Sequence, residues 1–389
     1  MLFLIDKPFV SDFLIKTMKE NGYRVVSTPV AREMIKDDSL TWISEELAAD
    51  IIEKDPHTPL YTNSENALTW IAGNTNGSEL SDHIQLFKDK ARFRELILTL
   101  FPGFFYTTVK LDDIQYLSLE GIPKPFVIKP SVGFFSLGVH IVRNQSDWNR
   151  VKNELSISKL EGIYPPSVLN TSTFIIEEYI NGEEFAVDCY FNHTGEVVIL
   201  NILHHRFSSG TDTSDRVYTT SKEIVLKYKD SFEAFLNAMG KAAGIRNFPA
   251  HVELRMDASG KINPIEVNPL RFGGWCTTGD LPGLALGYNL YEYYYNMRKP
   301  DWEKIFENRA DKIYSIVVLN NNSGLSPADI KGFDYDLLGE DFENALMIRK
   351  LDIKEYPVFG FLFAETSAGN EEELTKILVS DLKKYINPG

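Results

Sequence analysis

The chain has 389 residues, enough for two or three domains, and its 43% hydrophobic and 24% charged residues are typical of a folded globular protein. Its 55 acidic residues outnumber its 40 basic residues, and the formal net charge of −15 argues against binding to nucleic acid or anionic membrane surfaces. Cys189 and Cys276 form no CxxC pair, which excludes a disulfide framework or a structural zinc site built from them.

Residues 1–80 are predicted to form a Rossmann-like α/β domain. Residues 2–5 and 23–27 have the pattern of buried strands, and residues 8–21, which begin with a proline, that of an amphipathic helix. The turn after the first strand contains no glycine, so a GxGxxG dinucleotide site is not expected there. The polar stretch 74–78 breaks the pattern and places the first boundary near residue 80.

Residues 81–300 are predicted to form an antiparallel α+β domain, and residues 301–389 a small C-terminal α+β region. In the larger domain the expected strands are 126–129, 139–142, 174–178, 185–191, 251–256 and 262–267, and the expected helices are 81–100, 146–160 and 231–244. The C-terminal region ends with an expected strand at 358–364 and an expected helix at 371–386.

Lys129 ends an expected strand and precedes a loop that contains Gly133 and Gly138. The two glycines have Walker A spacing, but Val139 and His140 follow where that motif requires Lys and Ser or Thr, so a P-loop is excluded. What remains is a flap whose backbone amides close over phosphates while Lys129 contacts them. A solvated lysine beside a glycine turn is the alternative.

Four carboxylates flank a turn at residues 180–182. Glu177 and Glu178 end one expected strand, and Glu183 and Glu184 begin the next. Glu177 and Glu184 are candidate acceptors for a purine amino group and for ribose hydroxyls. A charged hairpin connection is the alternative.

A third cluster lies on the hairpin formed by residues 251–256 and 262–267. If its strands pair symmetrically about the turn, the two-residue period places Glu253, Glu266 and Asn268 on one face. Their carboxylate and amide oxygens suit Mg²⁺, with room for waters and nucleotide phosphates. A solvent-facing pair of carboxylates is the alternative.

Taken in chain order, these clusters resemble the ATP-grasp superfamily over about residues 88–278. The resemblance implies an ATP-grasp fold behind a Rossmann-like pre-ATP-grasp domain, with a nucleotide between two α+β subdomains, one of them a flap subdomain at about 104–178. It implies ATP and Mg²⁺, or Mn²⁺, as cofactors, and Glu253, Glu266 and Asn268 as metal ligands. The nucleotide contacts that it implies are Lys90, Lys129, Ser136, Glu177, Glu178, Ile180 and Glu184.

The sequence departs from the family pattern at two places. Phe134 and Phe135 occupy the flap, where relatives usually have smaller residues. Relatives of the biotin carboxylase, carbamoyl phosphate synthetase and amino-acid ligase branches usually place an arginine two residues after the metal asparagine, whereas this chain has Leu270 there. The resemblance therefore assigns the catalytic arginine role to Arg271, and His251 would add a hydrogen-bond donor near the phosphates.

The activity implied is that of an ADP-forming carboxylate–amine ligase. A substrate carboxylate would attack the γ-phosphate to give an acyl phosphate, and an amine would then displace phosphate to form an amide or peptide bond between amino-acid-like substrates. The candidate substrate contacts are His204, His205, Arg206, Arg216 and Arg255. Because adjacent residues of an extended backbone point to opposite faces, at most one of the two histidines is expected to enter the site.

Three other classes of function stay open. A carboxylase or carbamoyl-phosphate-type subunit would activate bicarbonate, an adenylating ligase would release AMP, and a nucleotide sensor would bind without turnover. The metal triad argues against the sensor. No apolar run reaches the roughly 18 residues of a membrane span, and no signal peptide is recognisable. We therefore expect small-molecule substrates, a cytoplasmic location, no nucleic-acid or membrane partner, and either a monomer or a homodimer.

Overall fold

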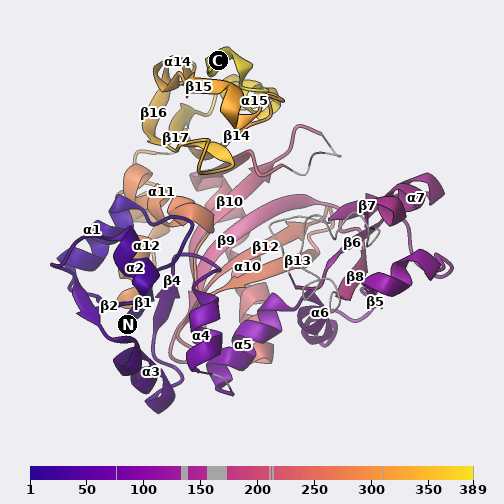
Figure 1. The fold of residues 1–389 in the computed structure, drawn as a ribbon, viewed down its shortest axis with the longest axis horizontal. Coiled ribbons are helices and arrows are strands. Elements are labelled where there is room, and N and C mark those ends of the chain that lie inside the picture. The colour runs from indigo at the N-terminus through magenta and orange to yellow at the C-terminus, as the bar shows by residue number, and fades with distance from the viewer. Residues whose placement is uncertain are drawn as a thin grey trace.

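The structure is a computed structural model, and it describes residues 1–75, 77–132, 139–155, 173–209, 212, 214–309 and 311–388. An N-terminal parallel sheet and a small antiparallel sheet lie on opposite sides of a large antiparallel sheet (Figure 1). Among these residues, no helix is long and apolar enough to cross a membrane.

The N-terminal domain is built on a parallel sheet with the strand order β3-β2-β1-β4. Its elements are β1 (Leu2–Leu4), α1 (Asp12–Glu20), β2 (Arg24–Val26), α2 (Pro29–Met34), β3 (Thr41–Ile43), α3 (Glu45–Lys54), β4 (Leu60–Thr62) and α4 (Leu68–Asn74). The predicted parallel layer is therefore confirmed. Helix α1 begins at Asp12 rather than at residue 8, because the Ser11 side chain caps it by accepting a hydrogen bond from the Leu14 amide (3.1 Å).

The helix predicted at residues 81–100 is in fact two helices, α5 (Glu79–Lys88) and α6 (Lys90–Leu98). They meet at Asp89, whose carboxylate accepts a hydrogen bond from the backbone amide of Ala91 (2.9 Å) and so begins α6. The break places Lys90 in the first turn of α6. Its backbone amide donates to the carbonyl of Ser131 (2.8 Å), which ties α6 to the small sheet.

The small sheet is antiparallel, in the order β5-β8-β6-β7. Its elements are β5 (Tyr106–Lys110), the 3-10 helix η1 (Leu111–Tyr116), β6 (Phe126–Pro130), β7 (His140–Val142), α7 (Gln145–Glu154) and β8 (Thr173–Glu178). Phe126 and Trp148 pack in a separate core beneath it. This sheet matches the expected flap subdomain, but the flap loop itself, residues 133–138 with Ser136, lies outside the described residues.

The large sheet has eight strands in the order β13-β12-β9-β10-β11-β14-β17-β16. They are β9 (Glu183–Phe191), β10 (Val197–Arg206), β11 (Val217–Ser221), β12 (Phe248–Met256), β13 (Ile262–Pro269), β14 (Lys312–Asn320), β16 (Asn344–Lys350) and β17 (Val358–Ser367). Helix α10 (Lys222–Ala243) covers one face and begins earlier than the predicted residue 231, because Ser221 caps it. The short 3-10 helix η2 (Gly274–Cys276) and helix α11 (Thr277–Ala285) follow β13, and α12 (Leu290–Tyr295) packs against the N-terminal domain.

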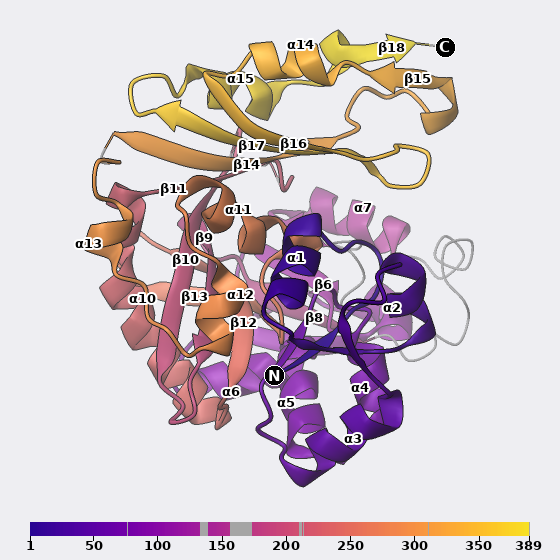
Figure 2. The ribbon, with the colours of Figure 1, turned by 90° about the vertical axis from the view of Figure 1, so that its left-hand side faces the viewer.

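The C-terminal region contributes strands to the large sheet and also forms a further layer. Strands β14, β16 and β17 extend the large sheet, while β15 (Ile330–Phe333), β18 (Ile386–Pro388), α14 (Tyr335–Glu340) and α15 (Glu372–Val379) lie over them (Figure 2). Short helices α13 (Trp302–Ile305), η3 (Pro327–Asp329) and η4 (Lys383–Tyr385) connect these elements. The helix predicted at 371–386 was therefore too long: it ends at Val379, and the chain finishes in a strand that pairs with β15.

Candidate functional site

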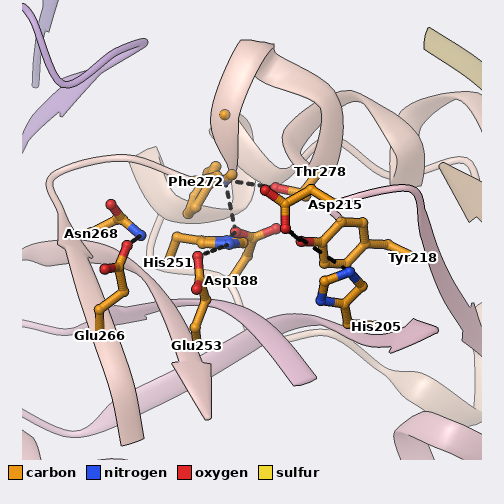
Figure 3. A network of polar contacts seen from close by, with 12 residues as sticks. Asp188, His205, Asp215, Tyr218, His251, Glu253, Glu266, Asn268, Phe272 and Thr278 are labelled. Carbon is orange, nitrogen blue, oxygen red and sulfur yellow. Dashed lines mark hydrogen bonds and ion pairs between the residues drawn. The ribbon is translucent and has the colours of Figure 1, made fainter. Parts of the chain in front are cut away.

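Four polar side chains share one face of the β12–β13 hairpin. The register pairs Glu253 with Glu266 and His251 with Asn268, so the two-residue period brings all four to the same side (Figure 3). The predicted grouping of Glu253, Glu266 and Asn268 is confirmed, and His251 joins it.

Cations approach this face from two directions. Nζ of Lys90, in the first turn of α6, lies 3.2 Å from Oε2 of Glu266. Nη2 of Arg271 donates to Oδ1 of Asn268 (2.6 Å), and Nδ2 of Asn268 in turn donates to Oε1 of Glu266 (3.2 Å). The chain directly after β13, where Leu270 departs from the family pattern, therefore places the Arg271 guanidinium against the hairpin face.

The two carboxylates of the hairpin differ in their protonation equilibria. Burial raises the pKa of Glu253 well above its usual value, and the neighbouring Glu266 raises it further. Burial acts on Glu266 in the same direction, but Lys90 and Lys129 overcome it and bring its pKa to about 2. Two nearby carboxylates whose charges repel are an arrangement that a divalent cation would relieve.

The described residues contain no preassembled group of three His, Cys, Asp or Glu side chains that could hold a metal ion. The oxygens that could do so are the Glu253 and Glu266 carboxylates and the Asn268 amide, which are the oxygen donors that Mg²⁺ prefers. Such a set supplies only part of an octahedral shell, which leaves positions for water and phosphate oxygens.

A buried ion-pair network lies at the junction of α6, β6 and β8. The two carboxylate oxygens of Glu177 contact Nζ of Lys129 (2.5 Å) and Nε of Arg94 (2.6 Å). Despite burial, these two cations lower the pKa of Glu177 to about 2. Glu177 is thus the counter-ion of two buried cations, and the adenine contact that the resemblance implies for it stays a prediction.

A cavity of about 370 Å³, here called the first cavity, opens between the small sheet and the hairpin. Lys88, Lys90 and Lys129 lie on one side of it, and the segment from Glu177 to Ile180 on another. Burial, together with Lys90 and Arg271, lowers the pKa of Lys88 to about 8. Cations at one end and a backbone segment at the other suit a nucleotide, with its phosphates toward the lysines.

Glu184 lines the first cavity and is held by two partners. Its Oε1 lies 2.9 Å from Nδ1 of His205, and its Oε2 accepts a hydrogen bond from Nε of Arg255 (2.8 Å). Arg255 also donates to the backbone carbonyl of Ile180 (2.7 Å). The residues implied for the ribose and adenine contacts, Glu184 and Ile180, are therefore brought together by Arg255.

Of the candidate substrate contacts His204, His205 and Arg206, only His205 lines the first cavity. Residues 203–206 continue strand β10, so His205 points into the first cavity, while His204 stacks on Phe185 on the opposite face (5.1 Å between ring centroids). This confirms that at most one histidine enters. Arg206 instead pairs with Glu371 (2.7 Å).

Arg216 does not line the first cavity either. It is buried beside α15, where its Nη1 donates to the carbonyl of Ile377 (3.5 Å). Of the three arginines considered for substrate binding, Arg255 lines the first cavity, where it contacts Glu184 and the Ile180 carbonyl. Arg206 and Arg216 instead contact Glu371 and the Ile377 carbonyl, which belong to the C-terminal region. The structure therefore does not bring the three arginines together at one site.

Sequence reasoning missed Asp188, which is fully buried on β9. Its Oδ1 lies 2.7 Å from Nδ1 of His251 and accepts a hydrogen bond from the backbone amide of Gly273 (3.1 Å) (Figure 3). It therefore orients the imidazole and holds the chain after β13. The available signal was a lone carboxylate within an otherwise apolar strand, residues 185–191.

A second cavity, of about 1350 Å³, adjoins the first and shares Asp215, Glu253 and Arg271 with it. His251 lines only the second. The hairpin carboxylates thus lie where a nucleotide in one cavity could meet another molecule in the other.

Comparison with known proteins supports this architecture. Residues 122–279 match the family model of the ATP-grasp domain. L-amino acid ligase from Bacillus licheniformis is similar to the chain with a TM-score of 0.69 and 16% identity, over 100% of this chain and 98% of that one. A search of curated protein sequences gives no match.

Two further solved structures share the fold. N5-carboxyaminoimidazole ribonucleotide synthetase from Thermotoga maritima has a TM-score of 0.63 and 16% identity, over 100% of this chain and 98% of that one. Biotin carboxylase from Campylobacter jejuni has a TM-score of 0.62 and 12% identity, over 94% of this chain and 87% of that one. The expected ATP-grasp fold is therefore confirmed.

Proposed function

We propose that the chain, whose residues 122–279 match the ATP-grasp family model, is an ATP-dependent, ADP-forming ligase that joins a carboxylate to an amine and acts on amino-acid-like substrates. The observation that carries the proposal is the position of Glu253 and Arg271, which line both cavities beside Glu266 and Asn268. A reaction between a nucleotide and a second molecule requires such a shared polar boundary.

The first step transfers the γ-phosphoryl group. A carboxylate oxygen of the substrate attacks the γ-phosphorus of ATP, the bond to the bridging oxygen breaks, and ADP leaves with its electrons. Because charge spreads over the phosphoryl oxygens, the protein must mainly position and neutralise the group. Lys90, Lys129 and Arg271 supply fixed cations for this task. Mg²⁺ held by Glu253, Glu266 and Asn268 would supply further neutralisation when bound.

The second step forms the amide. The amine attacks the acyl carbon of the acyl phosphate, phosphate leaves with the bonding electrons, and the proton lost by the nitrogen goes to the departing phosphate. His251 faces the second cavity, and Asp188 fixes its orientation through Nδ1, so its other ring nitrogen is available for a polar contact with the reacting groups. No protein nucleophile is needed in this scheme.

The proposal is tested by measuring ADP release from Mg-ATP by the purified protein with single amino acids, pairs of amino acids, bicarbonate or no addition. We expect release to rise with amino acids and an amide product to form. A rise with bicarbonate alone would indicate a carboxylase-type activity, AMP would indicate adenylation, and ATP binding without turnover would indicate a non-catalytic nucleotide-binding protein.

The matched variants are Glu266→Gln and Glu120→Gln. Glu266 lies beside Lys90 and Asn268 at the hairpin face, and its loss is expected to abolish turnover because it removes a charged oxygen ligand. Glu120 is exposed, away from both cavities, and its change should leave turnover intact. Full activity of Glu266→Gln with Mg²⁺ would remove the metal assignment. A cytoplasmic location and a homodimeric state stay predictions.

A further inference from the structure

The walls of the second cavity include three parts of the chain that lie far apart in the sequence. The loop at residues 7–10 follows β1, residues 273–278 follow β13, and the C-terminal region supplies β14, β17 and the loop at 355–358. Its volume of about 1350 Å³ exceeds what a single small metabolite fills. The site that adjoins the hairpin is therefore shaped in part by the C-terminal region.

Polar side chains and an aromatic cluster both line this cavity. Where it meets the first cavity, its lining includes Glu253 and Arg271. The aromatic cluster consists of Phe9, Trp275, Tyr356 and Phe361, and Val318 pairs with Phe361 across strands β14 and β17. A ligand that contacts both groups has a reactive polar group and an apolar side chain.

The aromatic side chains around Trp275 form a preorganised wall. The ring centroid of Trp275 lies 6.2 Å from that of Phe9, 5.5 Å from that of Tyr356 and 5.7 Å from that of Phe361. The Trp275 backbone has a left-handed φ of 58°, which is costly for a bulky residue.

Arg349, on β16, holds this strained segment in place. Its Nη1 donates to the Trp275 carbonyl (2.6 Å), and its Nη2 donates to the buried carboxylate of Asp280 (2.6 Å). The ring wall is thus anchored by a C-terminal strand, and a substrate would meet it already formed.

Charge around the cavity disfavours a phosphorylated or acidic ligand. Among its described lining residues, the carboxylates are Glu33, Asp215, Glu253 and Glu355, and the lysine and arginine side chains are Lys7 and Arg271. Lys7 already pairs with Glu33 (3.3 Å). That leaves Arg271 for one anionic group of the ligand, so a second anionic group would face a net negative wall.

We propose that the second cavity binds the substrate of the ligation with its carboxylate toward Arg271 and selects a large apolar or aromatic side chain at the ring wall. The C-terminal region is the part of the chain that sets this selectivity. This inference rests on the proposed ligase function and specifies its substrate class.

The test is calorimetric titration of the full chain with L-phenylalanine, L-aspartate and ribose 5-phosphate, each with and without Mg²⁺ and a non-hydrolysable ATP analogue. L-phenylalanine is expected to bind at least roughly tenfold more tightly than the other two probes. Equal or tighter binding of L-aspartate or ribose 5-phosphate overturns the inference, as does undetectable binding of L-phenylalanine. Failure of the ATP analogue to bind refutes the proposed function instead, because the titrations without nucleotide still test the cavity.

Val318→Phe enlarges a lining side chain beside Phe361 of the aromatic cluster, and Val379→Phe is its matched control on the exposed surface of α15. Val318→Phe is expected to weaken L-phenylalanine binding roughly tenfold or more while affinity for the ATP analogue stays unchanged. Tyr356→Ala should also weaken L-phenylalanine binding, because it removes one ring from the aromatic wall around Trp275. Tyr356 lies in a loop, so this change is less prone to cause misfolding. If both variants bind L-phenylalanine as Val379→Phe does, the cavity is not the side-chain site.

Discussion

Glu177 is expected to contribute strongly to folding, because it is the counter-ion of two buried cations. The side chains of Glu177, Lys129 and Arg94 come from β8, β6 and α6, and the three residues are 3%, 5% and 2% exposed. Replacing Glu177 with glutamine keeps the shape but leaves two largely buried positive charges without a carboxylate.

The magnitude follows from the proton equilibrium of Glu177. Its pKa falls from a usual 4.5 to about 2 in the folded protein. At about 1.4 kcal/mol per pKa unit, this corresponds to about 3 kcal/mol of stabilisation. Breaking a buried ion pair by removing one partner typically costs about 3–5 kcal/mol, so the two approaches agree. The loss is a large share of the roughly 5–15 kcal/mol that stabilises a typical protein.

The assay is urea unfolding of the wild type, Glu177→Gln and the neighbouring control Glu178→Gln. Because the folded pKa of Glu177 is depressed, its contribution is fully present above pH 4.5 and is lost as the pH falls toward about 2. The difference between the wild type and Glu177→Gln should therefore shrink by about 2 kcal/mol between pH 7 and pH 3. A difference below about 1 kcal/mol at pH 7, or one that does not change with pH, would refute the reasoning.

Three further predictions concern the site and the turn that precedes β9. Lys129→Ala should weaken ATP binding measured by calorimetry, because Lys129 lines the first cavity and would act as a point charge on the phosphates of the proposed nucleotide. The effect should shrink as salt rises. Equal ATP affinity would show that Lys129 is a purely structural cation. Arg271→Lys should leave ATP binding near normal but lower amino-acid-dependent ADP release at least roughly tenfold. The reason is that an ammonium group cannot reproduce the planar guanidinium that donates to both Asn268 and the Phe272 carbonyl. Near-normal ADP release would exclude a catalytic role of Arg271. Gly182→Ala should lower the free energy of unfolding by about 1–3 kcal/mol. Gly182 has a φ of 130°, and a Cβ there would lie 2.2 Å from the Met256 carbonyl oxygen. An unchanged midpoint of urea unfolding would contradict this prediction.

Local features of the chain were predicted well because they depend on neighbouring residues. The turn at residues 257–260 joins two strands of alternating pattern, so the hairpin itself could be predicted from the sequence. Its register shifts between Glu253 and Leu254, and this irregularity, which the sequence does not reveal, pairs Glu253 with Glu266. The opposite orientations of His204 and His205 followed from the same two-residue period. In the parallel N-terminal layer, successive buried strands and helices likewise carried their own signals.

Element ends were predicted less well, because side-chain caps decide them. Asp89 ends α5, where its backbone amide donates to the Gln85 carbonyl, and its carboxylate begins α6, inside a segment whose pattern reads as continuous. Without that break, Lys90 would not stand in a first helical turn beside Glu266. The sequence thus identified the lysine, and the capping geometry decided how it faces the hairpin.

The sequence by itself determined the motifs that resemble the ATP-grasp superfamily, the residues that share the hairpin face, and the lysines that are candidates for phosphate binding. Only the tertiary structure decided that Glu177 neutralises Lys129 and Arg94, and that buried Asp188 orients His251. It also decided that strands from the C-terminal region complete the large sheet and wall the second cavity. The physical reason is range: backbone period and turn chemistry act over a few residues, whereas counter-ions and cavity walls come from segments that meet only when the whole chain packs.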